Sequence, residues 1–250
     1  MKEAGIAQLV ECKLPKLDVA GSIPVARSIF AILILVFFLF PAQAADRAQT
    51  KKTLEKARLT VETFAETREM EAFLSLIKSA RAIFVVPELL RGGFILGASG
   101  GTGVVFVRDP RAETWNGPSF YTLGGVSFGL QAGGQVSEVI ALIMTARGVS
   151  AFLNDSIRLG ADVGVAVGPF GIGASAATQN LSADVLVFAK SKGLYGGLSL
   201  DGALVKVRED LNEAFYGSPV QPRDVLLSGK MRREEAQGLM KLLSDLARER

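Results

Sequence analysis

Apolar residues alternate with small or polar residues along much of the chain after residue 80. Residues 103–108 and 160–168 show this two-residue period, and residues 127–137 show it most clearly. In that last segment Phe128, Leu130, Ala132 and Val136 fall on one face, and Ser127, Gln131, Gln135 and Ser137 fall on the other. Strict alternation is typical of strands with one buried face, as in antiparallel sheets, whereas strands of a parallel sheet are apolar on both faces. The pattern therefore predicts a mainly antiparallel sheet.

Glycine is concentrated in the same part of the chain. Of the 27 glycines, only Gly5 and Gly21 precede residue 45. Many of the others fall inside predicted strands, where glycine marks bulges, bends or the close approach of another backbone, so we expect a curved sheet. The glycine-rich residues 97–103 are expected to form a hairpin and not a phosphate loop, because Val104 and Val105 stand where a P-loop needs lysine and a hydroxyl residue.

Helical periodicity appears on both sides of the predicted strands. Residues 45–80 carry apolar residues at three- and four-residue spacing without glycine or proline, which predicts one bent helix or two consecutive ones. A short helix is expected near residues 149–154 and a final helix over residues 232–246, while residues 114–118 are rich in turn formers and hold Trp115 as a packing anchor. The predicted fold class is α+β, with a glycine-rich, mainly antiparallel curved sheet flanked by N-terminal and C-terminal helices.

The N-terminal part of the chain has the layout of an export signal. Residues 29–40 are all apolar, Arg27 precedes them, and residues 41–44 read Pro-Ala-Gln-Ala. As a helix this run rises about 18 Å, which is short of the roughly 30 Å hydrocarbon core of a bilayer. We expect a signal peptide over residues 29–44, cleaved after Ala44, with an uncleaved anchor as the alternative. The protein is then expected in the periplasm or cell envelope.

Residues 1–28 do not fit this layout. They are longer than the segment that usually precedes the apolar part of a signal, and they contain glycine, proline and charges of both signs. We interpret them as an extension produced by a misassigned start. The remaining residues 45–250 are expected to form one domain.

The residue types that most often carry catalysis or metal binding are scarce. The sequence has no histidine, and its one cysteine is Cys12, which precedes the predicted cleavage site. Histidine-dependent catalysis, zinc–thiolate sites and disulfides are therefore excluded for the processed chain. Residues 171–176 match a dinucleotide fingerprint only loosely, because no acidic residue follows at the required distance. No catalytic residue, cofactor or metal is predicted.

Acidic residues within the predicted strands leave one enzymatic alternative open. Two carboxylates brought close together can act as acid and base, as in glycosidases. The simpler interpretation places all four candidates on solvated strand faces. They are Glu138, Asp162, Asp184 and Asp201.

The charge pattern points away from nucleic acid and toward a membrane surface. The net charge is +3, without the clustered basic stripe of a nucleic-acid binder. The predicted first helix combines basic residues with an apolar stripe, so it could lie on an anionic bilayer. The candidate lipid-binding residues are Lys51, Lys52, Lys56, Arg58, Arg91, Lys190 and Lys192.

Several ordered blocks of sequence resemble the SYLF domain family. The resemblance covers about residues 50–217, and its blocks are weak singly but specific in their order and spacing. They are residues 80–87, 93–104, Trp115 with 118–120 and Gly124-Gly125, 131–135, 159–162, 190–202 and 214–217.

This resemblance implies a non-catalytic protein that binds anionic phospholipids. Eukaryotic members of the family bind phosphoinositides and actin, neither of which an exported bacterial protein would meet, so phosphatidylglycerol or cardiolipin is the expected lipid. The competing interpretation is a structural or protein-interaction module of the cell envelope that does not depend on lipid.

Overall fold

The computed structural model describes residues 24–93, 96–128, 133–168, 182–191, 194–195, 200–229 and 231–248, with the backbone alone for residues 24–44, 69, 96, 127–128, 133 and 194–195. The chain divides into two compact units, Met1–Pro41 and Ala42–Arg250. Helix α1 (Pro24–Glu66) runs from the first unit into the second, so the predicted signal segment is helical where it is described. The remaining elements all belong to the second unit.

The helical segment predicted over residues 45–80 is two helices. Helix α1 ends at Glu66, a short 3-10 turn η1 (Arg68–Met70) follows, and α2 (Glu71–Ile77) completes the segment. Thr67, between them, has an extended backbone, and its hydroxyl donates to the carbonyl of Thr63 one turn earlier. This side-chain bond competes with continuation of the helix, as threonine commonly does.

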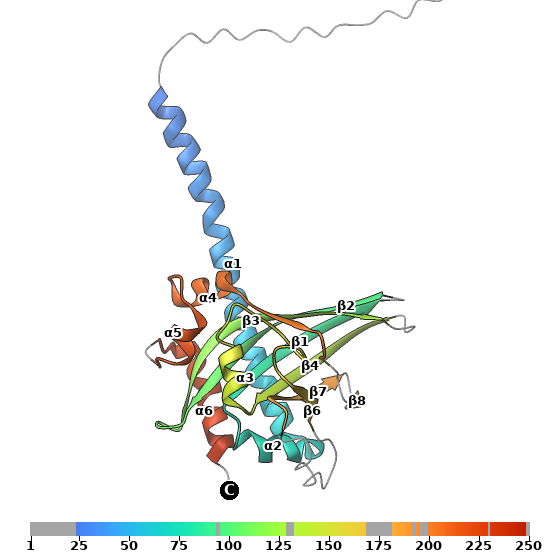
Figure 1. Cartoon of the computed structure of the whole chain (residues 1–250). Coiled ribbons are helices and arrows are strands. Elements are labelled where there is room, and N and C mark those ends of the chain that lie inside the picture. Colours follow the sequence, from blue (N-terminus) through green and yellow to red (C-terminus); the bar gives the residue numbers. More distant parts are fainter. Residues whose placement is uncertain are drawn as a thin grey trace, which may run out of the picture. The chain divides into compact units, whose positions relative to one another are not determined.

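The sheet is curled and mostly antiparallel, as predicted (Figure 1). Four long strands follow α2: β1 (Ala82–Gly93), β2 (Leu96–Asp109), β3 (Thr114–Phe128) and β4 (Gly133–Ile143). The shorter strands are β5 (Ser156–Arg158), β6 (Val165–Val167), β7 (Val185–Ser191), β8 (Leu194–Tyr195) and β9 (Leu204–Val207). In the described part of the chain the order is β5-β9-β3-β2-β1-β4-β7-β6, with β8 on β7, and only β6 and β7 pair in parallel.

Further helices surround this sheet. Helix α3 (Ala146–Ala151) follows β4, and α4 (Glu209–Tyr216) follows β9 directly. The chain then forms α5 (Pro222–Leu226) and α6 (Glu234–Arg248). The predicted terminal helix corresponds to α6, whereas α4 and α5 were not anticipated.

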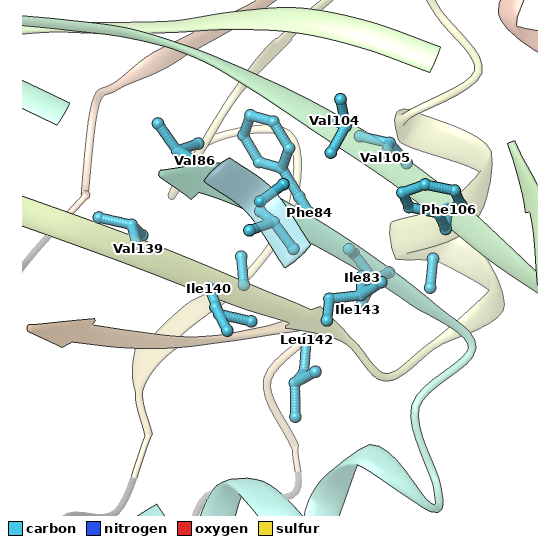
Figure 2. Packing of buried hydrophobic residues seen from close by; sticks show 14 of the residues in the cluster. Ile83, Phe84, Val86, Val104, Val105, Phe106, Val139, Ile140, Leu142 and Ile143 are labelled. Atoms are coloured by element: carbon cyan, nitrogen blue, oxygen red, sulfur yellow. The ribbon is translucent and has the colours of Figure 1, made fainter. Parts of the chain in front are cut away.

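Both faces of the sheet are covered over the first half of β1. On one face, called the α1 face, Phe73 of α2 packs on Phe188 of β7, and Phe215 of α4 packs on Phe120 of β3. On the opposite face, called the α3 face, Phe152 after α3 makes edge-on contacts with Phe84 and Tyr121. Figure 2 shows the buried side chains of three neighbouring strands: Ile83, Phe84, Val86, Val104, Val105, Phe106, Val139, Ile140, Leu142 and Ile143.

Four local predictions were wrong. The alternating residues 127–137 are not one strand but include the end of β3 at Phe128 and the start of β4 at Gly133, and residues 129–132 lie outside the described residues. Strand β1 does not end at Pro87 but continues to Gly93, and the pairing register shifts at this point because proline has no N–H to give to the ladder. Residues 97–103 are not a hairpin but lie within β2. Residues 114–118 open β3 and contain a cis Gly117–Pro118 peptide, while Trp115 is fully buried as expected.

Candidate functional site

The second half of the long sheet leaves part of the α1 face uncovered. Strand register aligns Leu90, Gly100, Gly124 and Leu204 in one row across β1, β2, β3 and β9. Thr102, Thr122 and Lys206 form the neighbouring row, and side chains directly opposite one another lie on the same face. We call these two rows, together with Val126, the open patch.

The open patch exposes apolar side chains that a folded core would normally bury. Leu90 is 60% exposed, Val126 is 84% exposed and Leu204 is 44% exposed. Gly100 and Gly124 lie between them without side chains. The result is a partly apolar surface whose centre is formed by the backbone of the two glycines, which makes it a candidate interaction site.

Helix α1 borders the open patch and carries two of the predicted lysines to it. Lys52 and Lys56 line a cavity of about 360 Å³ together with Leu90, Gly100 and Thr102. The Nζ of Lys56 lies 2.5 Å from a carboxylate oxygen of Glu88, so its charge is already partnered. Lys52 is exposed and has no ion-pair partner among the described residues.

The other two predicted residues of α1 face elsewhere. Lys51 is exposed but does not line this cavity. Arg58 pairs with Glu62 one turn along at 3.1 Å, and its side chain passes close to Gly238 of α6. The four basic residues of the helix therefore do not form one surface, because consecutive residues on a helix point about 100° apart.

The predicted basic residues of the sheet are also dispersed. Arg91 follows Leu90 in β1 and so points to the α3 face, where partial burial lowers its pKa. Lys190 is half-buried, and strand register places it opposite Glu138 of β4. Glu138 accepts a hydrogen bond from the hydroxyl of Thr60 of α1 at 3.3 Å. Lys192 lies outside the described residues.

A second and larger cavity lies on the other side of the open patch. It has a volume of about 790 Å³ and lies along β3, β9 and the start of α4. Its residues include two cations that the sequence analysis missed, Lys206 and Arg208. The alternation of Leu204, Lys206 and Arg208 in the sequence predicts that these residues share one face of a strand. It does not predict that this strand lies beside β3. The full lining is Thr122, Gly124, Gly125, Val126, Gly202, Leu204, Lys206, Val207, Arg208, Glu209 and Asp210.

Arg208 lies between the two cavities. Its guanidinium pairs with Asp210 at 2.6 Å and also reaches the hydroxyl of Thr102, which lines the smaller cavity, at 3.5 Å. The hydrogen bond from Arg208 lowers the pKa of Asp210, and the same bond raises the pKa of Arg208. Both groups are thus held in their charged forms.

One of the four acidic candidates, Asp184, lies in a network of hydrogen bonds. Asp184 was predicted on a solvated face, but it is buried. It accepts hydrogen bonds from Arg147, from the hydroxyl of Thr145 at 2.5 Å and from the backbone N–H of Gly164 at 2.8 Å. The bond from Arg147 is the main reason that its pKa falls to about 2. These contacts tie α3 and the chain before β6 to the start of β7, which is a structural role.

Two further findings concern the described part of the chain alone. It contains no group of three or more side chains of the types that could hold a metal ion. None of its helices combines the length and the apolar character needed to cross a membrane. The dinucleotide-like residues 171–176 lie outside the described residues.

Comparison with known proteins places these features in one family. Residues 124–246 match the Ysc84 family, described as "Las17-binding protein actin regulator". SH3 domain-containing YSC84-like protein 1 of Pongo abelii is 32% identical over 171 residues, which are 67% of this chain and 49% of that protein. Protein YSC84 of Saccharomyces cerevisiae is 28% identical over 200 residues, 77% of this chain and 42% of that protein.

These matches cover a shared domain and not whole proteins. The chain spans about half the length of the curated relatives it matches. The family match includes β9, α4 and the C-terminal helices, and hence Gly124, Leu204, Lys206 and Arg208. The larger cavity is therefore built mostly from residues within the family domain.

Proposed function

Because residues 124–246 form a Ysc84/SYLF domain, we propose that this protein binds anionic phospholipid at a membrane surface and catalyses no reaction. The observation that carries the proposal is the open patch, where exposed apolar residues lie beside the cations of α1 and β9. A bilayer presents the same pair of properties, an apolar interior beneath a negative surface. Each lysine or arginine near such a surface contributes about 1 kcal/mol to binding.

The test is co-sedimentation of the purified protein with vesicles of phosphatidylglycerol or cardiolipin, against vesicles of neutral lipid. Binding should need anionic lipid and weaken as salt is added, because screening shortens the reach of surface charge to about 8 Å at physiological ionic strength. Replacing Lys52 and Lys206, which line the two cavities of the open patch, by glutamate should reduce binding by about tenfold or more. Lys56 is left in place because it pairs with Glu88.

A charge-matched control separates local from general electrostatics. Lys78→Glu combined with Lys241→Glu changes the net charge equally at exposed positions that do not line either cavity of the open patch. The control should bind vesicles as the unmodified protein does. Equal losses in both variants would remove the assignment to the open patch, and no binding to any vesicle would remove the proposed function.

The proposal includes export. Arg27, the apolar residues 29–40 and the small residues before Ala45 support cleavage after Ala44, which would place the protein in the periplasm or cell envelope. N-terminal sequencing of the protein recovered from an envelope fraction tests this. A mature chain that begins at Ala45 is the expected result, and an intact leader would contradict it.

Protein binding is the competing function. Besides the family description, one yeast relative, 30% identical over 161 residues, is named LAS seventeen-binding protein 3. Those names describe the relatives. For this chain, retention by envelope proteins in the absence of lipid, together with failure to bind vesicles, would favour a protein-interaction role.

A further inference from the structure

We infer that the larger cavity of the open patch holds one acyl chain of an anionic phospholipid, so that the protein takes up single lipid molecules as well as adhering to a bilayer. This inference rests on the proposed function and extends it from surface binding to lipid uptake. The cavity volume of about 790 Å³ lies within the range of small-molecule sites, roughly 300–1,000 Å³.

The floor of the cavity suits a hydrocarbon chain. Gly124 lies between Thr122 and Val126 along one face of β3, and Leu204 stands directly opposite it on β9. A Cβ built on Gly124 would meet only the carbonyl oxygen of Ser99, at 3.8 Å, so the space above this residue is open. A chain lying there would cover Val126 and Leu204, the two exposed apolar residues of the cavity, and their removal from water would favour binding.

The backbone below the centre of the cavity is already paired, which disfavours the addition of a peptide strand at Gly124 and Leu204. A bound peptide strand needs the free N–H and C=O groups of a sheet edge. Strand β3 is paired with β2 on one side and β9 on the other at Gly124, and β9 is paired with β3 and β5 at Leu204. At these two residues the floor thus offers no free sheet edge, which suits a ligand that makes no hydrogen bonds along its length.

Charge at the rim sets the class of headgroup. Lys206 lines the cavity and, among the described residues, has no ion-pair partner. Lys52, which lines the neighbouring cavity, also has no ion-pair partner among the described residues. Arg208 lies between the two cavities. Glu209 and Asp210 also line the rim, and Asp210 forms an ion pair with Arg208. The residues that line the two cavities include four cations (Lys52, Lys56, Lys206 and Arg208) and three carboxylates (Glu88, Glu209 and Asp210), and this net charge of +1 favours a phosphate-bearing headgroup.

The test uses monomeric myristoyl lysophosphatidylglycerol below its micelle concentration, with binding measured by calorimetry on the full chain. Gly124→Val places a branched side chain on the floor of the cavity, where the acyl chain would lie, and should weaken binding by about tenfold because chain and side chain would overpack. Gly92→Val is the control, since a Cβ there meets nothing within 4 Å and Gly92 lines neither cavity of the open patch. The control should bind as the unmodified protein does.

A second pair of variants guards against a folding defect. Leu204→Glu places a charge in the cavity at a position that is already 44% exposed, and Leu227→Glu makes the same change at a 52% exposed position outside it. Only the first should lose lysolipid binding. Equal affinity of all variants, or a wild-type protein that sediments with anionic vesicles but binds no monomer, would overturn the inference and leave the proposed function intact. Failure to bind either vesicles or monomer would overturn both.

Discussion

At the scale of single residues, the same residue type has different roles in different parts of this sheet. Gly103 is packed tightly: a Cβ there would lie 2.4 Å from the carbonyl oxygen of Val85 and 2.6 Å from the ring of Phe84. Gly92 and Gly124 have open space instead. Glycine at position 103 therefore allows the Phe84 ring to pack on the α3 face, whereas glycine at position 124 leaves a surface hollow.

This difference predicts the effect of alanine at two positions. Gly103→Ala should lower the free energy of unfolding by about 1–3 kcal/mol, because the added methyl overpacks the core beside Val85 and Phe84. Gly92→Ala should change it by less than about 0.5 kcal/mol, as expected of a surface position. Denaturant titration of both variants measures the change, and equal stability of the two would contradict the packing argument.

Asp184 gives the protein a specific sensitivity to acid. Its folded-state pKa of about 2 lies below its usual 3.8, mainly through the hydrogen bond from Arg147. A carboxyl with a depressed pKa stabilises the fold fully above its unfolded pKa and loses that contribution as pH falls toward the folded pKa. The unfolding temperature should therefore fall between about pH 4 and pH 2, and fall less steeply in Asp184→Asn.

The same variant should be less stable at neutral pH. The amide replaces a charged acceptor of three hydrogen bonds, and hydrogen bonds to charged groups contribute about 1.5–3 kcal/mol. Thermal unfolding of the two proteins across this pH range provides the measurement. Parallel profiles would show that another carboxyl controls the acid response.

At the scale of elements, the structure shows how much periodicity alone can predict. The alternation in residues 103–108 and the leucines of 232–246 identified β2 and α6, because each pattern reports one buried face. Pro87 and residues 114–118 wrongly predicted breaks in the sheet, because proline and glycine commonly end strands. Here a register shift accommodates Pro87, and pairing with β2 holds residues 114–118 in β3.

The terminal helix should contribute measurably to stability through its apolar face. Leu243 of α6 is fully buried, while Lys241 is exposed on the other side of the helix. Leu243→Ala should lower the free energy of unfolding by about 2–5 kcal/mol, through lost burial and the cavity left behind. Lys241→Ala, with little change in helix propensity, is the control. A small effect in both variants would mean that α6 is loosely attached.

At the scale of the whole molecule, one continuous core joins the helices to the sheet. The buried cluster runs from Leu54 of α1 through all the long strands to Leu246 of α6. A domain with a single core usually unfolds in one cooperative step. The fluorescence of Trp115, which is the sole tryptophan and fully buried, should therefore change at the same denaturant concentration as the helical circular dichroism. Separate midpoints would reveal independent parts.

The sequence by itself determined the α+β class, the antiparallel sheet and the helices at either end, because these depend on residue periods within single segments. The tertiary structure alone decided which residues share a surface. Strand register sets Gly124 beside Leu204 and Thr122 beside Lys206, and burial moves Asp184 from a predicted surface to the interior. Such pairings join segments far apart in the chain, and no local pattern encodes which segments meet or in what register. The open patch and its cavities could therefore be identified only from the tertiary structure.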